Sequence, residues 1–521
     1  MKSLTEPPHA LPHSHSKLLS AHLTCLFGIL VCAAAGNSEP AQNPAGKDRI
    51  HCQKGTQPFI PERAGYYDTV WPSEHTDLWR SHAVMGAGLP ANFAAGQLRV
   101  TTARLNLPVW GYTRDQREVF VTGGSPVFLS IFTESIKTGK TLSPAEEALL
   151  LLKDLTNNSI PFVAKIDPKT MNVKQLDLKG GTTVNYTGGL LMHQNGFVYG
   201  VCQSVLYKIN PNLMRIVGKL SLPLVGTNAT QNFTTTYNGL QVVASGELVL
   251  KGFSLFDSED IPGWLLLIDP DDLTIDVKQS SNVSSARMTI QQSADGKTWL
   301  YHVNDTQALR FEINNTGFVL DTAWTRQYRT TADTNTQASS QLLFGNIGQT
   351  AFADNTAPGA MTPIKLYTQT VVTTNLPAEL TGTAAFSTNA AGFNFFMIAG
   401  DPFQTQLLVY YDPMNNLLSA HRIDADGTLD PVWEHDGYKT SASPALVPDR
   451  DLLYIDDYRN GNDYLVILKL STGEELASIK LAATLPTIGG IVPGMNDDVY
   501  LLSSEADGTN GLISRVFVSK R

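Results

Sequence analysis

The chain has 521 residues, of which 42% are hydrophobic and 17% charged, so it can bury a large core and does not have the composition of a disordered or coiled-coil protein. Its formal net charge is -10 at pH 7, and it contains no long run of Lys or Arg. This balance argues against nucleic acid, and against an anionic membrane surface, as the partner.

The N-terminus has the pattern of a targeting segment. A polar lead with Lys2 and Lys17 precedes an apolar run over residues 18–35, and the small residues at its end fit an A-x-A cleavage site. We therefore predict that residues 1–35 are a cleaved signal peptide and that the mature protein is secreted, with no membrane attachment. An uncleaved membrane anchor is the alternative, because the run is near the lower length limit for a spanning helix.

Cysteine use agrees with export. Removal of the signal leaves Cys52 and Cys202, and two thiols in an oxidising compartment favour one disulfide, here between the N-terminal arm and the second repeat. Two free buried thiols are the alternative.

Sequons of the type N-x-S/T gather in one third of the chain. If the host glycosylates proteins, they predict glycans on one side of the molecule. They start at Asn157, Asn185, Asn228, Asn232, Asn282, Asn304 and Asn314.

Residues 36–94 are predicted to form an N-terminal arm that leads into the folded body. Residues 36–59 are polar and contain several prolines, whereas Tyr66–Pro90 is dense in aromatic and ionisable residues. The following segment, Leu98–Leu105, alternates between apolar and polar residues as a strand does.

One helical insertion is expected over Ala145–Leu155, between strand-like segments. Ser143 is a good N-cap, Pro144 suits the first helical position, and Glu146 completes a capping box. Because the run Leu149–Leu152 is apolar around more than one face, this helix is expected to pack on the body of the protein.

From Phe162 onward, an apolar strand closed by a turn recurs at intervals of about 43 to 59 residues, and each interval has room for four short strands. Several of these strands end in Asp-Pro or Asn-Pro, at Asp167, Asn210, Asp269 and Asp412. Asx side chains bond the backbone just ahead and Pro presets the turn, which places these residues at the hairpin from the third to the outer strand.

Eight such runs predict an all-β fold, an eight-bladed β-propeller over residues 95–521, with seven blades as the alternative. Small residues mark the expected innermost strands, where crowding is greatest, as at Gly188-Gly189, Ala286, Ala384-Ala385, Ala442-Ser443 and Gly489-Gly490. The last run ends just before Arg521, so Leu98–Leu105 is expected to supply the missing outer strand and to close the ring.

The third strands end in Ile-Asp-Pro or in turns such as Leu470–Glu474, a repeat form that resembles the quinoprotein alcohol dehydrogenase-like superfamily of eight-bladed propellers. The resemblance implies an enzyme that holds pyrroloquinoline quinone and calcium at one end of the channel. The sequence departs from that pattern, because outer-strand segments such as Val173–Leu176 and Leu476–Lys480 carry no docking tryptophan. It also contains neither an adjacent Cys pair nor a C-x-x-C-H haem motif.

The densest group of candidate ligand-binding residues is Glu74, His75, Asp77, Arg80 and His82. Two imidazoles, two carboxylates and a guanidinium could supply a general base, metal ligands or an anion clamp. The structural alternative is a segment whose tryptophans pack over the ring while its charges are solvated or paired.

Arg287 is a further candidate, because its neighbours suggest an innermost strand, where a confined cation could bind a carboxylate or phosphate. If the strand register turns it outward, it is a rim charge instead. No metal site is predicted. The acidic stretches Asp424–Asp430 and Asp456–Asp463 read as hairpin turns, and His435 stands where a calcium loop needs Glu.

These features favour a secreted propeller that binds a small molecule, a glycan or an extracellular protein at the channel mouth, without a cofactor. The alternative is an enzyme, either a quinone-dependent dehydrogenase, with calcium and pyrroloquinoline quinone, or a metal-assisted hydrolase or lactonase. An enzyme should bring carboxylates, Asn or His from several blades together at one end of the channel.

Overall fold

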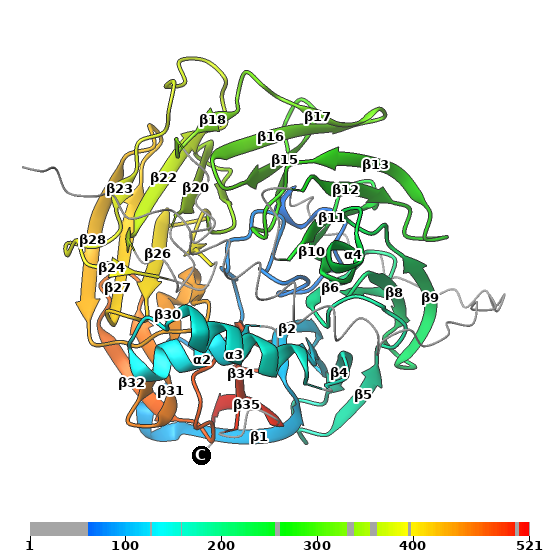
Figure 1. The fold of residues 1–521 in the computed structure, drawn as a ribbon. Coiled ribbons are helices and arrows are strands. Elements are labelled where there is room, and N and C mark those ends of the chain that lie inside the picture. Colours follow the sequence, from blue (N-terminus) through cyan, green and yellow to red (C-terminus); the bar gives the residue numbers. More distant parts are fainter. Residues whose placement is uncertain are drawn as a thin grey trace, which may run out of the picture.

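The computed structural model describes residues 61–125, 128–157, 159–255, 261–330, 338–354, 362–393, 397–505 and 510–519. Within these residues, eight antiparallel sheets are arranged radially around a central channel (Figure 1). The all-β class and the eight-bladed ring are confirmed.

The first four blades follow the chain order from the innermost to the outermost strand. Blade 1 contains β2 (Pro108–Asp115), β3 (Glu118–Gly123), β4 (Phe162–Ile166) and β5 (Val173–Asp177). Blade 2 contains β6 (Thr187–Met192), β7 (Val198–Cys202), β8 (Val205–Asn210) and β9 (Arg215–Ser221). Blade 3 contains β10 (Thr235–Val242), β11 (Leu248–Ser254), β12 (Gly263–Ile268) and β13 (Ile275–Ser281). Blade 4 contains β14 (Thr289–Gln292), β15 (Thr298–Val303), β16 (Gln307–Asn314) and β17 (Gly317–Leu320), and β18 (Arg326–Gln327) also pairs with β16.

The other four blades complete the ring. Blade 5 contains β19 (Leu342–Phe344), β20 (Gln349–Ala353), β22 (Lys365–Thr370) and β23 (Thr383–Ala384), while β21 (Thr362–Pro363) pairs with β24 (Ala391–Gly392). Blade 6 contains β25 (Ala399–Gly400), β26 (Leu407–Asp412), β27 (Leu417–Ile423) and β28 (Leu429–Asp436). Blade 7 contains β29 (Ala445–Val447), β30 (Leu452–Arg459), β31 (Asn462–Lys469) and β32 (Glu475–Lys480). Blade 8 contains β33 (Ile491–Pro493), β34 (Asp498–Ser504), β35 (Asn510–Val518) and β1 (Leu98–Asn106).

Ring closure follows the prediction from the sequence. Strand β1 pairs antiparallel with β35 in an unbroken register, from Leu98 opposite Val518 to Asn106 opposite Asn510. The N-terminal strand is therefore the outer strand of the last blade, and the first and last blades are held together by the same segment of chain.

The small residues of the innermost strands were predicted correctly in part. A Cβ atom added at Gly188 would lie 1.7 Å from the Tyr237 carbonyl oxygen of the next blade, and one at Gly489 would lie 2.4 Å from the Val109 carbonyl oxygen. The prediction was wrong for Ala384, which lies in the outermost strand of blade 5. The inner strand of blade 6 is β25, which is itself small, Ala399–Gly400.

The Asx turns form as expected, with one correction to their place in the blade. Asp167 Oδ1 accepts hydrogen bonds from the backbone N–H groups of Lys169 and Thr170, at 2.8 and 3.1 Å. Asp412 makes the equivalent bonds, but it ends β26, the second strand of blade 6 and not the third. The inner strand of that blade, β25, is too short to show a pattern in the sequence. The strand that ends at Asp412 was therefore predicted as the third of its blade, although it is the second.

Two tryptophans outside the outer-strand segments named in the sequence analysis connect neighbouring blades. Trp324, just after β17, donates its indole N–H to the Thr370 carbonyl oxygen of blade 5 at 2.8 Å. Trp433 in β28 donates to the Leu470 carbonyl oxygen of blade 7 at 2.9 Å. Blades 4 and 6 therefore each bond to the next blade through a tryptophan, whereas Val173–Leu176 and Leu476–Lys480 carry none, as stated above.

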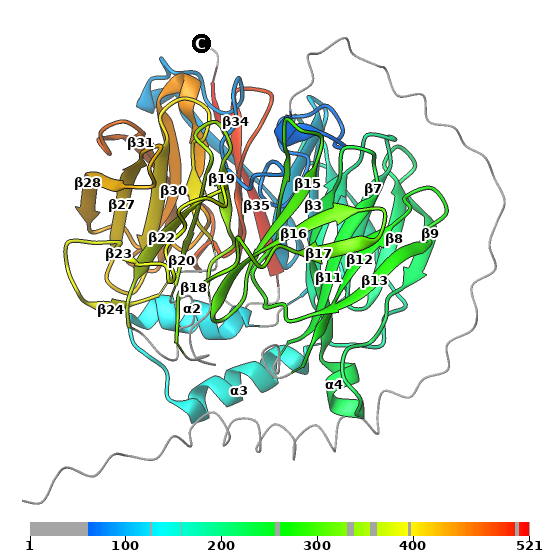
Figure 2. The ribbon, with the colours of Figure 1, turned by 90° about the horizontal axis from the view of Figure 1, so that it is seen from above.

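The helical insertion contains two helices, α2 (Leu129–Thr138) and α3 (Pro144–Leu155), and a short α4 (Ala229–Phe233) lies elsewhere. Helix α3 and its capping box were predicted. Helix α2 was missed because its cap comes from α3: Asp154 accepts from the backbone N–H and the hydroxyl of Ser130, at 2.9 and 2.6 Å. Both helices lie against one end of the ring (Figure 2). The predicted packing holds for Leu151, which is buried, while Leu149 is 68% exposed.

The segment before β1 lies inside the ring, and not over it. Its backbone hydrogen-bonds to the innermost strands one after another: the carbonyl oxygens of Trp71, Leu78, Trp79, Ser81 and His82 accept from blades 1, 4, 5, 6 and 7, at 2.8 to 3.0 Å. Tyr67 and Pro72 bond to Met192 of blade 2, and Gly88 bonds to Gly494 of blade 8. The Tyr66 hydroxyl contacts Gln241 of blade 3. Residues 66–88, which we call the channel segment, therefore contact all eight blades.

Among the described residues, no helix is long and apolar enough to cross a membrane.

Candidate functional site

The predicted cluster on the channel segment is buried. Its charges are not solvated, but they are partly paired, as the structural alternative allowed. Glu74, His75, Asp77, Arg80 and His82 are each no more than 4% exposed. Burial of this many ionisable groups is costly unless they are paired. The tight path of the segment explains how they reach the interior, since Thr76, Arg80 and His82 all have a positive φ of 56 to 77°, a conformation that L-residues adopt rarely and that clusters at functional sites.

Arg287 lies in this cluster, as the functional alternative for it required. Its side chain is buried just before β14, and Nε and Nη2 lie 2.9 and 2.8 Å from Glu74 Oε1. The guanidinium also lies over the Trp110 ring, 5.5 Å from its centre. Burial opposes the positive charge, but the charge and hydrogen bond of the Glu74 carboxylate, together with Tyr186 and Tyr112, outweigh this effect and raise the pKa of Arg287.

Arg80 approaches the same carboxylate from the other side. Its Nη2 lies 3.8 Å from Glu74 Oε2, and its Nε donates to the Met288 carbonyl oxygen at 2.6 Å. Burial lowers the pKa of Arg80 to about 10, with Glu74 acting in the opposite direction, so the side chain stays cationic at neutral pH.

The two histidines contact each other. His75 Nδ1 and His82 Nε2 form a hydrogen bond, and His75 Nε2 lies 3.9 Å from Glu74 Oε1. Burial, and then the charge of Arg80, lower the pKa of His82 to about 3 and the pKa of His75 well below its usual value. Both imidazoles are therefore neutral near pH 7, and they do not add to the positive charge.

Asp77 also belongs to the predicted cluster, but its side chain bonds within the channel segment and not to Glu74 or the histidines. Its carboxyl group accepts from the backbone N–H and the hydroxyl of Ser81, at 3.1 and 2.5 Å, and so stabilises the turn that carries Arg80. Burial raises the pKa of Asp77 to about 7.

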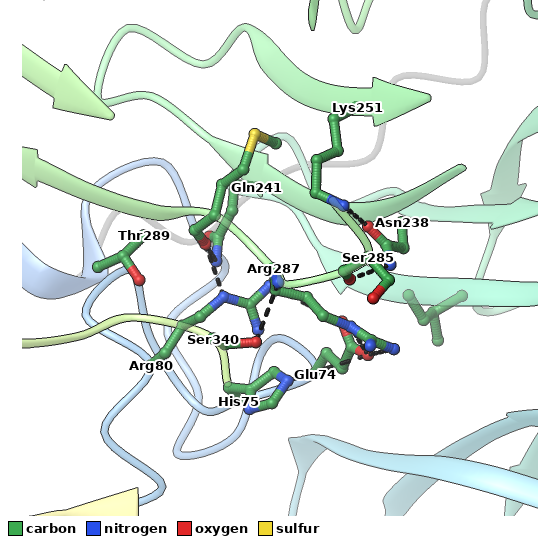
Figure 3. A network of polar contacts seen from close by, with 12 residues as sticks. Glu74, His75, Arg80, Asn238, Gln241, Lys251, Ser285, Arg287, Thr289 and Ser340 are labelled. Atoms are coloured by element: carbon green, nitrogen blue, oxygen red, sulfur yellow. Dashed lines mark hydrogen bonds and ion pairs between the residues drawn. The ribbon is translucent and has the colours of Figure 1, made fainter. Parts of the chain in front are cut away.

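Blades 3 and 4 add polar side chains that the sequence reading did not select (Figure 3). Lys251 in β11 is buried and hydrogen-bonds through Nζ to Asn238 Oδ1 in β10. Burial, and then Arg287, lower the pKa of Lys251 well below its usual value. Asn238 also donates to the Ser285 carbonyl oxygen at 2.8 Å. A lysine inside the apolar run Leu248–Phe253 is the signal that could have identified this site.

Several buried polar atoms in this cluster have no hydrogen-bond partner within the described part of the chain. They are Glu74 Oε2, His75 Nε2, Arg80 Nη1 and Nη2, and Trp110 Nε1. Folded proteins leave few buried polar groups unpaired, and a cluster of them points to a water, ion or ligand that completes the site.

The acidic stretches form hairpins, as predicted. Asp424–Asp430 lies at the β27–β28 turn, and the Asn460-Gly461 pair joins β30 and β31 with positive φ at both residues. The side chains of Asp456 and Asp463 are buried, however, and bond to Ser441 and Thr487. Across the described residues, no group of three or more His, Cys, Asp or Glu is placed to hold a metal.

The remaining predicted residues lie elsewhere. Cys202 is a free buried thiol, so the disulfide is not seen, and its predicted partner Cys52 lies outside the described residues, as does the signal peptide. Of the sequon residues, Asn228, Asn282 and Asn314 are exposed. Asn157, Asn185 and Asn232 are half-buried. Asn304 is 4% exposed, and its side-chain oxygen accepts from the backbone N–H of Thr306 and Gln307.

Known structures share this architecture. No family model and no curated protein sequence matches the chain. Its structure is similar to the quinohemoprotein alcohol dehydrogenase from Comamonas testosteroni, with a TM-score of 0.55 and 11% identity, over 98% of this chain and 85% of that one. A europium-containing methanol dehydrogenase gives a TM-score of 0.54 and 10% identity, over 87% and 98%. A quinohemoprotein alcohol dehydrogenase of Pseudomonas putida HK5 gives 0.54 and 11%, over 92% and 83%. The chain has the fold of the quinoprotein alcohol dehydrogenases. At such identities the likeness concerns the fold alone.

The calcium ion that this fold implies does not fit Glu74 and its neighbours. Calcium takes six to eight oxygen ligands, mostly carboxylates and carbonyls, whereas Glu74 at the centre is engaged by Arg287 and flanked by Arg80. The channel segment also hydrogen-bonds along the innermost strands of the ring. We therefore derive no chemistry through quinone and calcium.

Proposed function

We propose that the protein is a secreted β-propeller that binds a small polar molecule at the centre of its channel. The observation that carries the proposal is the set of buried, unpaired polar atoms of Glu74, His75, Arg80 and Trp110. Each unpaired buried group costs about 1 to 3 kcal/mol, and a ligand that pairs with several of them offsets this cost.

The burial of these atoms favours a small molecule over a glycan or a protein partner. Arg287 is 5% exposed, while Tyr186 and Ser285 are half-buried. Asn238 connects these groups, because its side-chain amide donates to the Tyr186 hydroxyl at 3.3 Å and to the Ser285 carbonyl oxygen. Asn185, next to Tyr186, bonds to Ser125 and Ser159, which flank the helical insertion, so these groups lie at the end of the ring that carries the insertion (Figure 2).

Analysis of small molecules carried by the native protein tests the proposal. Protein purified without denaturation is unfolded in acid, and the released compounds are identified by mass spectrometry. We expect one compound in a near-equal molar amount, and at least tenfold less of it from Arg80→Gln. The matched control is Arg422→Gln, an exposed arginine of β27. If no compound is released and no member of a metabolite library raises the unfolding temperature, the proposal is wrong.

An enzyme is the second candidate, because two hydrogen-bonded imidazoles, His75 and His82, lie beside the Glu74 carboxylate, with His75 Nε2 3.9 Å from Glu74 Oε1. Imidazoles and a carboxylate are groups that can move a proton to or from a bound substrate. Metal analysis of the purified protein, combined with dye reduction after addition of pyrroloquinoline quinone and calcium, separates the two candidates. Stoichiometric calcium together with dye reduction would favour a dehydrogenase and contradict simple binding. A tightly bound metal without dye reduction would instead direct the search to a hydrolase or lactonase.

Secretion is tested separately. N-terminal sequencing of the mature protein is expected to begin near residue 36, after the A-x-A pattern. A sequence that begins at Met1 would contradict it.

A further inference from the structure

We propose that the molecule bound in the channel carries a carboxylate or phosphate group and that Arg80 is the residue that binds this group. The inference rests on the proposed function and names the class of ligand for the same site. It is drawn from the charges of the cluster and from the hydrogen bonds that each guanidinium already makes.

Positive groups outnumber negative ones at the centre of the channel. Arg80 and Arg287 lie beside Glu74, and Lys251 lies near them with its side chain bonded to Asn238 (Figure 3); all four side chains are buried. The polar neighbours His75, His82, His302 and Tyr112 are neutral near pH 7 because burial disfavours their charged forms. Asp77 is a further neighbour of Arg80, but its carboxyl group bonds to Ser81, and burial raises its pKa to about 7. Even with Lys251 neutral, two guanidiniums face the Glu74 carboxylate, so the positive charge beside Glu74 exceeds the negative charge.

The two arginines differ in how fully they are paired. Arg287 Nε donates a hydrogen bond to Glu74 Oε1 at 2.9 Å, and Arg287 Nη2 forms an ion pair with the same oxygen at 2.8 Å. Arg80 uses only Nε, toward a backbone carbonyl, while Nη1 and Nη2 form no hydrogen bond. The uncompensated charge therefore belongs to Arg80.

The two Arg80 nitrogens without a hydrogen-bond partner, Nη1 and Nη2, match the geometry of an oxyanion. The two terminal nitrogens of a guanidinium form a planar fork that fits two oxygens of a carboxylate or phosphate. A cation is excluded by Arg80 and Arg287 together, and a neutral molecule would leave the buried charge uncompensated. Trp110 Nε1 and His75 Nε2 provide further unpaired atoms that could bond the same ligand.

The backbone holds this fork in place. Arg80 has a φ of 61°, and its two neighbours are fixed to the ring, because the carbonyl oxygens of Trp79 and Ser81 accept from Leu343 and Gly400 at 3.0 and 2.8 Å. A side chain held this way pays little entropy on binding, which is the usual benefit of a preorganised site.

Thermal unfolding and calorimetric titration with defined probes test the inference. The probes are sodium acetate and inorganic phosphate, with acetamide as the neutral isostere of acetate, all at one fixed ionic strength. We expect acetate or phosphate to raise the unfolding temperature with increasing concentration and acetamide to have no effect. The anion that acts at the lower concentration shows whether the ligand carries a carboxylate or a phosphate group. Acetamide acting as well as both anions would overturn the anionic class.

Variants assign the effect to Arg80. Arg80→Gln should abolish the anion effect, and Arg422→Gln should retain it. Arg80→Lys keeps the charge but loses the fork, so at least tenfold weaker binding is expected, which also covers the case where Arg80→Gln does not fold. Unchanged binding by Arg80→Lys and Arg80→Gln would overturn the assignment. A neutral or cationic compound released from the native protein would contradict this inference but leave the proposed function standing, whereas absence of any bound compound would contradict the proposed function.

Discussion

Arg287 Nε donates to Glu74 Oε1 at 2.9 Å, although 213 residues separate the two in the sequence. The bond joins the channel segment to blade 4 inside the ring. Glu74 thereby compensates one buried guanidinium and lies within 3.8 Å of a second, that of Arg80. Removal of this carboxylate leaves buried positive charge without a partner.

We expect Glu74→Gln to destabilise the protein by about 3 to 5 kcal/mol, the usual cost of breaking a buried ion pair from one side. Urea denaturation followed by tryptophan fluorescence measures the change. Glu312→Gln is the control, because Glu312 pairs with Lys297 at 3.1 Å on the surface, where the loss is about 0 to 1 kcal/mol. Equal losses for the two variants would show that Glu74 does not hold the channel segment.

Gly188 provides a test of the crowded inner strands. A Cβ atom there would lie 1.7 Å from the Tyr237 carbonyl oxygen, so Gly188→Ala must move one blade relative to the next. Overpacking of this kind costs about 1 to 3 kcal/mol or more. Gly96→Ala is the matched control, because no heavy atom lies within 4 Å of the added Cβ, and its unfolding midpoint should change little. A Gly188→Ala protein as stable as the wild type would contradict the close packing of blades 2 and 3.

The repeat could be predicted from the sequence because each blade needs the same local features. Asx-Pro turns, alternating strands and small inner residues recur, and they predicted the eight blades and the closing strand Leu98–Leu105. Blade 6 shows where this reading fails: its inner strand has two residues, Ala399 and Gly400, too few for any periodicity. Asp412 was consequently assigned to the wrong strand.

The candidate site was predicted less completely, for a physical reason. The ionisable stretch Glu74–His82 was visible, but burial depends on where the ring places it, and no local pattern carries that information. Arg287 reaches Glu74 only through the assembled channel. Lys251 and Trp110 belong to different blades, and each looks locally like a residue of a strand. Sites built from single residues on many blades leave no linear motif.

The cap of helix α3 is a local prediction that the structure bears out and that experiment can measure. Ser143 Oγ accepts from the backbone N–H of Glu146, whose carboxylate returns to the backbone N–H of Ser143 at 2.8 Å. We expect Ser143→Ala to lower the stability of this helix by about 0.5 to 2 kcal/mol. Faster amide hydrogen exchange over residues 145–155, with unchanged exchange in blades 2 and 3, is the expected result. Unchanged exchange in the helix would mean that packing on α2 alone determines its stability.

A pH dependence follows from the carboxyl groups of blade 7. Asp456 in β30 and Asp463 in β31 are both buried. Burial raises the pKa of Asp456 to about 7, and burial followed by the charge of Asp456 raises the pKa of Asp463 well above its usual value. Because both pKa values are higher in the folded state, their protonated forms favour folding. This contribution is fully present below about pH 4, the unfolded pKa. The part from Asp456 is lost as the pH rises through about 7, and the part from Asp463 is lost as the pH rises through its own raised pKa.

We therefore expect the free energy of unfolding to fall between pH 5 and pH 8, and Asp463→Asn to reduce this fall by about 1.4 kcal/mol for each unit of pKa difference removed. Asn keeps an oxygen that can accept from Thr487, as Asp463 does at 3.1 Å. Asp77 titrates in the same range, so the difference between variant and wild type isolates the blade 7 pair. Asp426→Asn is the control, because bonds from Thr428 lower the pKa of this exposed carboxyl and place its titration below pH 5. If the free energy of unfolding of wild type and of Asp463→Asn changed with pH in parallel, the pKa of Asp463 would not be raised by folding.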